Sequence, residues 1–171
     1  LRENGIVSIK KKAFRELFGL RFLDLSYNNL THIEPRMFFH TPNLAHLNLS
    51  NNHHIRIKKK TFSYLNRLKS LNLADCSIDF LDEKTFRSLV SLEVLDLSMN
   101  PRMKIKRILF KELTNLKKLY LTSDSTFCTP VDFSNLNSLE RVLFDSISCD
   151  LFMEKLKNNF TKIEFDYQEN H

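Results

Sequence analysis

Leucines and other large hydrophobic residues return at a fixed interval along this chain. The segment LRFLDLSYNNLTHIEPRMFFHTPN begins at Leu20 and is followed from Leu44 by LAHLNLSNNHHIRIKKKTFSYLNR. The same order of hydrophobic and polar positions starts again at Leu68, Leu92 and Leu116, each 24 residues after the last, and once more at Leu139 after 23. Such a repeat predicts a solenoid in which every repeat contributes one short strand and stacks on its neighbours.

Within each repeat, the stretch L-x-x-L-x-L-x-x-N predicts a strand whose leucines point inward, at residues 22–26 of the first repeat. Strands of successive repeats are expected to pair in parallel and to form a curved sheet on the concave side. The residue that closes the strand can satisfy buried backbone groups through an amide. The position is occupied by an asparagine in three repeats, Asn28, Asn52 and Asn100, and by Cys76 and Asp124 in two others. Farther along, an apolar residue and a phenylalanine five positions later are expected to line the convex half of the core, in the pairs Ile33 and Phe38, Ile57 and Phe62, Leu81 and Phe86, and Ile105 and Phe110.

The fold class predicted is therefore an α/β repeat solenoid with a parallel sheet on the concave face and an irregular, 3-10 or short helical convex side. About seven coils form a single domain over residues 1–171, since two glycines and four prolines leave no flexible linker. Residues 1–19 form a partial repeat; because Leu1 falls in the phase of Leu25, we expect a piece of a longer protein, and the alternative is a degenerate first repeat that a partner chain covers. The complete repeats are 20–43, 44–67, 68–91, 92–115 and 116–138, and residues 139–171 supply terminal repeats and a C-terminal closure. That closure includes a short helix, predicted from the spacing of Leu151, Phe152, Lys155, Leu156 and Phe160.

Solvent-facing positions of the predicted sheet are the surface that a ligand would meet. They mix polar groups of both signs with a few large side chains, and the candidates for ligand binding are Phe22, Asp24, Tyr27, His46, Asn48, Asn72, Asp96, Met99 and Tyr120. Exposed aromatic and methionine side chains carry much of the energy of an interface, which makes Phe22, Tyr27, Met99 and Tyr120 the candidate anchors.

Positive charge gathers at equivalent places just after the convex isoleucine. The chain has a formal net charge of +6, and the basic ridge consists of Lys10, Lys11, Lys12, Lys58, Lys59, Lys60, Lys106 and Arg107. One interpretation is a polyanion site. The other is a solvated flank that keeps the solenoid soluble, and it is favoured because Glu34-Pro35-Arg36 and Asp82-Glu83-Lys84 interrupt the ridge.

Cysteines and glycosylation motifs add three further expectations. Cys128 and Cys149 occupy slots that are close in adjacent coils, so we predict a disulfide between them; buried free thiols are the alternative. Cys76 is expected to stay free. The acceptor pattern N-x-S/T occurs at Asn29, Asn48 and Asn159.

Motifs for catalysis are missing. The chain has no G-x-S-x-G elbow, phosphate-binding glycine loop or H-E-x-x-H, and His53-His54 lies in a turn without a second pair of metal ligands. We therefore expect no enzyme activity, no cofactor and no metal site.

The repeat resembles a known family over nearly the whole chain. Its period together with F-x-x-L-x-x-L, as in FSYLNRL, FRSLVSL and FKELTNL, looks like the typical class of animal extracellular leucine-rich repeats. The strand ends LDLSYN, LNLSNN and LDLSMN are similar to those of Toll and Toll-like receptor ectodomains.

This resemblance implies an extracellular, non-enzymatic recognition module: a fragment of an innate-immune receptor or co-receptor that binds a microbial or protein ligand. Its partners would include a co-receptor or a dimer partner, and it would meet a membrane only through a segment outside this chain. Two alternatives stay open. One is an extracellular matrix, adhesion or hormone-receptor repeat domain with a protein partner, and the other is an intracellular repeat scaffold.

Overall fold

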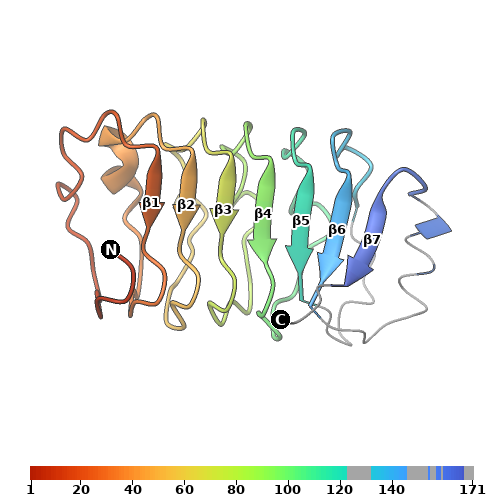
Figure 1. Ribbon diagram of the computed structural model, residues 1–171, viewed down its shortest axis with the longest axis horizontal. Coiled ribbons are helices and arrows are strands. Elements are labelled where there is room, and N and C mark those ends of the chain that lie inside the picture. The colour runs from red at the N-terminus through yellow and green to blue at the C-terminus, as the bar shows by residue number, and fades with distance from the viewer. Residues whose placement is uncertain (123–131, 146–153, 155–156, 159, 168–171) are drawn as a thin grey trace.

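Seven short strands, one from each successive repeat, form a single parallel sheet. The computed structural model describes residues 1–122, 132–145, 154, 157–158 and 160–167. Strand order follows the chain (Figure 1), and the register joins equivalent residues of neighbouring repeats, as in Leu23 with Leu47 and Leu47 with Leu71. The strands are β1 (Phe22–Asp24), β2 (His46–Asn48), β3 (Ser70–Asn72), β4 (Val94–Leu97), β5 (Lys118–Leu121), β6 (Arg141–Phe144) and β7 (Glu164–Tyr167). The solenoid predicted from the repeat is confirmed.

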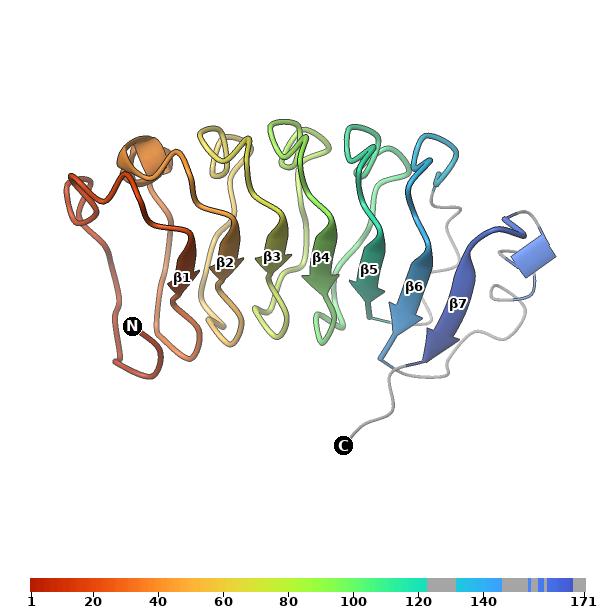
Figure 2. The same cartoon turned by 45° about the horizontal axis from the view of Figure 1, so that its top comes forward.

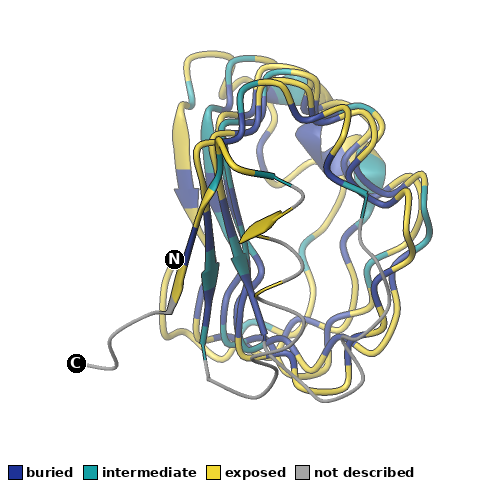
Figure 3. Cartoon of the chain, turned by 90° about the vertical axis from the view of Figure 1, so that its right-hand side faces the viewer, coloured by how far each residue is buried: buried dark blue, intermediate teal, exposed yellow. Residues whose placement is uncertain are grey.

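The core lies between the sheet and the irregular segments that return on the opposite side. Figure 2 shows the coils stacked side by side, and the end-on view of Figure 3 shows buried segments on both walls of the coil. Four equivalent phenylalanines, Phe38, Phe62, Phe86 and Phe110, are at most 1% exposed. Rings of consecutive repeats stack, with centroids 6.2 Å apart between Phe62 and Phe86. A 3-10 helix, η1 (Pro35–His40), carries the first of them, and Pro35 at its start suits the fixed φ that a first helical position requires.

Asparagine side chains tie neighbouring repeats together where each strand ends. Asn52 is fully buried; its Nδ2 donates to the carbonyl oxygens of Leu25 and Leu49 at 3.0 and 2.8 Å, and its Oδ1 accepts from the N–H of Leu30 at 3.0 Å. Asn28 and Asn100 bond in the same way. Cys76 replaces the asparagine in the third repeat and is a free, buried thiol whose Sγ donates to the oxygen of Leu49 at 3.2 Å. Burial raises the pKa of this thiol to about 12.

Residues 1–19 pack on the first repeat. The N–H groups of Asn4 and Ile6 donate to Oδ1 of Asn28, and Phe14 is buried, whereas Leu17 and Phe18 are exposed.

Several predictions for the C-terminal part lie outside the described residues: the Cys128–Cys149 disulfide, Asp124 and the sequon asparagine Asn159. Most of the predicted helix does so too, although the described residues 154 and 157–158 are helical. In the part of the chain that the structure describes, no helix is long and apolar enough to cross a membrane.

Candidate functional site

The parallel register arranges the solvent-facing side chains of the sheet in rows. One row crosses the strands through Phe22, His46, Ser70, Val94, Lys118 and Arg141. The next row contains five of the predicted ligand-binding residues, Asp24, Asn48, Asn72, Asp96 and Tyr120, on neighbouring strands. We call this surface the sheet face.

Phe22 and His46 form an ordered aromatic pair on the sheet face. Their rings are parallel within 1°, and the centroids are 4.4 Å apart. Phe22 nevertheless remains 68% exposed, while His46 is half-buried. An exposed aromatic ring held by a neighbour presents apolar area with little conformational entropy left to lose, which suits an interface anchor.

Four predicted binding residues also hold the backbone turn that follows each strand. Oδ1 of Asp24, Asn48, Asn72 and Asp96 accepts a hydrogen bond from the N–H two residues later, at 2.8–3.1 Å. Hydroxyls of Ser26 and Ser98 donate to the same carboxylates at 2.6 Å. What these residues can offer a ligand is therefore the second side-chain oxygen or the amide nitrogen.

The two aspartates of this row differ in their ionisation. Partial burial opposes the charge of Asp24, but hydrogen bonds from Ser26 and the nearby Arg2 outweigh it and lower the pKa. At Asp96, burial dominates over the hydrogen bonds from Ser98, and the charge of Asp145 acts in the same direction, so the pKa is raised.

Tyr27 and Met99 stand at the position where the chain leaves the strand with a left-handed backbone. Their φ angles are 54° and 56°, and the equivalent residues Asn51 and Asp75 have 57° and 52°. Both side chains are exposed; the Arg2 guanidinium lies 4.7 Å from the centre of the Tyr27 ring. A left-handed backbone is unfavourable for residues other than glycine, yet it recurs at this equivalent position in consecutive repeats. It is therefore a feature of the repeat and does not by itself indicate a ligand site.

A charge cluster lies directly before β3, β4 and β5, at the margin of the sheet face, and the sequence prediction did not single out its ion pairs. Glu93 joins two lysines from the adjacent repeats, at 3.1 Å from Lys69 and 2.9 Å from Lys117. Hydrogen bonds from Lys117 and Lys69 lower the pKa of Glu93. The signal was available, since these three residues share one phase of the repeat with alternating sign.

The basic ridge is not continuous. Its side chains are exposed, but the repeat that carries Glu34 separates Lys10–Lys12 from Lys58–Lys60. Two members have neighbours: the Lys106 ammonium lies 4.9 Å from the centre of the Phe80 ring, and Arg107 lies 3.7 Å from Asp132.

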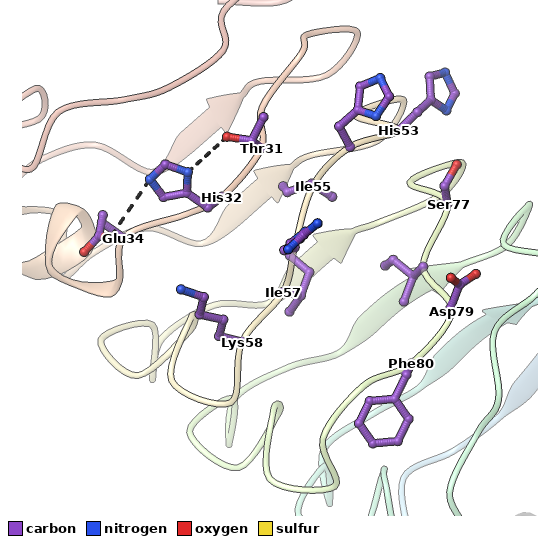
Figure 4. Close-up of a pocket in the computed structure, with 13 residues that line it drawn as sticks. Thr31, His32, Glu34, His53, Ile55, Ile57, Lys58, Ser77, Asp79 and Phe80 are labelled. Atoms are coloured by element: carbon purple, nitrogen blue, oxygen red, sulfur yellow. Dashed lines mark hydrogen bonds and ion pairs between the residues drawn. The ribbon is translucent and has the colours of Figure 1, made fainter.

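A cavity of about 990 Å³ opens on the flank of the solenoid that is formed by the segments after the strands, and the strands lie behind its lining residues in Figure 4. Three consecutive repeats line it, through residues within 31–34, 53–58 and 77–80. His32 contacts Thr31 at 3.0 Å and Glu34 at 4.0 Å there. Among the described residues, no group of three His, Cys, Asp or Glu side chains is placed to hold a metal ion.

The described sequons differ in access. Asn29 is exposed in the loop after β1, whereas Asn48 is half-buried in β2 and its Oδ1 is engaged with the backbone of Ser50, which is itself buried.

Comparison with known proteins gives one family and a consistent fold. The family model described as leucine rich repeat matches residues 1–53 and 51–101. A segment of 52 residues, 30% of this chain, is 44% identical to leucine-rich repeat-containing G-protein coupled receptor 5 of Rattus norvegicus, of which it covers 6%.

Two solved structures share the fold over nearly the whole chain. One is the structure of the Toll–Spatzle complex, described as a hub in Drosophila development and innate immunity, with a TM-score of 0.75 and 21% identity over 98% of this chain. The other is the TLR13–ssRNA13 complex, with a TM-score of 0.65 and 17% identity over 94% of this chain. The present chain spans only 22% and 28% of those two chains.

Proposed function

Because the chain belongs to the leucine-rich repeat family, we propose that it is a non-enzymatic recognition module that binds a protein or microbial ligand through its sheet face. We further propose that it is a piece of the extracellular part of an innate-immune, Toll-like receptor or co-receptor. The fold that it shares with Toll in complex with Spatzle and with TLR13 in complex with ssRNA13 supports this choice.

The Phe22–His46 pair is the observation that carries the binding proposal. Interfaces concentrate their energy in a few aromatic and arginine anchors that lie among weaker polar contacts. Phe22 is the most exposed of the large apolar side chains described, and its ring is already fixed against His46. Farther along the same face, Glu93 and its two lysines supply charged groups of both signs for orientation of a partner.

A second candidate function is an extracellular hormone-receptor, adhesion or matrix domain that binds a protein partner. The 44% identity with the G-protein coupled receptor over 52 residues favours it. Both candidates use the same surface, so ligand identity separates them.

The extracellular location has its own test in the sequons. Asn29, the acceptor, is exposed, and Thr31, the hydroxyl residue of its sequon, is exposed as well, so we expect a glycan on Asn29 when the chain is secreted from animal cells. Mass spectrometry before and after enzymatic deglycosylation would detect it. An unmodified Asn29 on secreted protein would argue against this expectation.

Recognition through the sheet face can be tested by an array of secreted proteins and microbial cell-wall preparations, probed with the chain as an Fc fusion. For ligands that bind, Phe22→Ala should weaken binding roughly 30-fold, the effect of losing an interface anchor. Phe39→Ala is the matched control, because Phe39 is 60% exposed but lies in η1, on the opposite side of the coil. The proposal is refuted if the chain retains no ligand from the array, or if Phe22→Ala and Phe39→Ala bind the ligand equally well.

A further inference from the structure

The flank cavity lies where two kinds of repeat meet. In the first and third repeats, the inward residue after the strand is Leu30 or Ile78, two positions beyond Asn28 or Cys76. In the second and fourth repeats it comes one position later, as Ile55 and Met103. In the second repeat the N–H of Ile55 donates to the oxygen of Asn52 at 3.0 Å and closes a turn, and His53 and His54 in this turn are exposed.

This alternation interrupts the pairing of the backbone along the flank. The first repeat pairs with the second through Arg56 N–H and Thr31 oxygen, at 3.0 Å, and the third pairs with the fourth through Lys104 N–H and Asp79 oxygen, at 2.9 Å. Within the described residues, no backbone hydrogen bond joins the second repeat to the third at the equivalent position, between Ile55 and Phe80. The cavity lies across this unpaired junction (Figure 4).

One wall of the cavity carries cations that have no acidic partner. Residues 53–60, HHIRIKKK, contain no carboxylate. Arg56 and Lys58 line the cavity, are exposed, and form no ion pair with any residue that the structure describes. His53 differs, because its Nδ1 lies 3.5 Å from Asp75. Arg56 and Lys58 are therefore available to an anionic ligand.

The rest of the cavity is not suited to a simple polyanion. Its lining also includes apolar side chains, since Ile57 is half-buried and Phe80 is 53% exposed, with the Lys106 ammonium 4.9 Å from the centre of the Phe80 ring. Asp79 and Glu34 also line it and would repel a ligand of uniform negative charge. A peptide combines a carboxylate with a neighbouring apolar side chain, and a guanidinium binds a carboxylate through two parallel hydrogen bonds.

We propose that this flank cavity is a docking site for an acidic segment of a protein partner, with a carboxylate of the partner on Arg56 and Lys58 and an adjacent apolar side chain on Ile57 and Phe80. The proposal deepens the proposed function and rests on it, since the partner is a protein, but it concerns a surface separate from Phe22 and His46.

A synthetic peptide in which glutamate alternates with leucine, flanked by glycine and serine, is the probe, and fluorescence anisotropy of the labelled peptide is the readout. The double variant Arg56→Ala/Lys58→Ala should weaken binding roughly two- to fivefold for each cation removed. Lys11→Ala/Lys12→Ala loses the same charge from an exposed part of the basic ridge and should bind as the parent does.

Probe chemistry separates the proposed occupant from the others. Peptides with Glu→Gln or Leu→Ser replacements should both bind more weakly than the parent peptide. The proposal is overturned if the Lys11/Lys12 variant weakens binding as much as the Arg56/Lys58 variant, or if the serine peptide and a heparin oligosaccharide bind as tightly as the original. If ligands from the array lose affinity with Phe22→Ala but not with Arg56→Ala/Lys58→Ala, the proposed function of the sheet face stands and this inference fails.

Discussion

Replacement of Asn52 by alanine tests whether the asparagine side chains hold the repeats together. The substitution removes four hydrogen bonds that cross between the first and second repeats or close the strand exit of the second. Two of the backbone groups keep another partner, since the oxygen of Leu49 also accepts from Cys76 and the oxygen of Ser50 accepts from the N–H of Tyr27. The oxygen of Leu25 also keeps a partner, because it accepts from Nδ2 of Asn28 at 3.0 Å. Of these four backbone groups, the N–H of Leu30 is the one left without a partner.

The magnitude follows from this one group. A buried donor left without a partner costs about 1–3 kcal/mol, so the free energy of unfolding should fall by about 1–3 kcal/mol. Water entering the space left by the amide moves the value toward the lower end. The chain itself provides an intermediate case: Asn52→Cys should lose less, because a thiol can donate to Leu25 as Cys76 donates to Leu49.

Urea unfolding followed by circular dichroism measures the difference. Asn66→Ala is the control, because Asn66 is exposed and its side chain makes no hydrogen bond to any described residue; it should change stability by no more than about 0.5 kcal/mol. If Asn52→Ala and Asn66→Ala unfold at the same urea concentration, the reasoning about stranded backbone groups is wrong.

Two further outcomes follow from perturbed ionisation. Asp96→Asn should raise the free energy of unfolding at neutral pH, because the amide keeps the Oδ1 acceptor, as Asn72 does one repeat earlier, and removes a charge whose burial raises the pKa. Since the pKa of Asp96 in the folded protein lies above the ordinary 3.8, the parent should regain stability relative to the variant as the pH falls through that folded pKa. Urea unfolding at several pH values checks this. A parent that is more stable than the variant at neutral pH would contradict it. Cys76, with its pKa raised to about 12, should resist iodoacetamide at pH ~8 in the native protein and react in urea, as peptide mass spectrometry would show; rapid native labelling would sink this expectation.

Much of the fold was predictable because it depends on the spacing of apolar and amide residues alone. Leu23, Leu47 and Leu71 recur at the same phase, and in a parallel stack the same phase means the same register. The buried phenylalanines and the bonding of Asn28, Asn52 and Asn100 follow from the same spacing.

Predicting the binding surface from the sequence was less complete. The pattern placed Phe22 and His46 on one face, but the parallel stacking of their rings depends on rotamers that neighbouring strands select. Asp24 and Asp96 were predicted as ligand-binding residues, and their second role in the turn depends on where the backbone N–H two residues later comes to lie.

The sequence by itself determined the repeat, the direction and register of the strands and the residues of the core, because a periodic chain that buries one side of every coil has few other arrangements. Only the tertiary structure decided how neighbouring coils differ. A displacement of one residue, between Ile55 in the second repeat and Ile78 in the third, leaves the apolar pattern nearly unchanged, but within the described residues Phe80 N–H and the oxygen of Ile55 form no hydrogen bond. A hydrogen bond between coils depends on where its donor and acceptor atoms lie to within a few tenths of an ångström, and the period of the sequence does not specify these atomic positions.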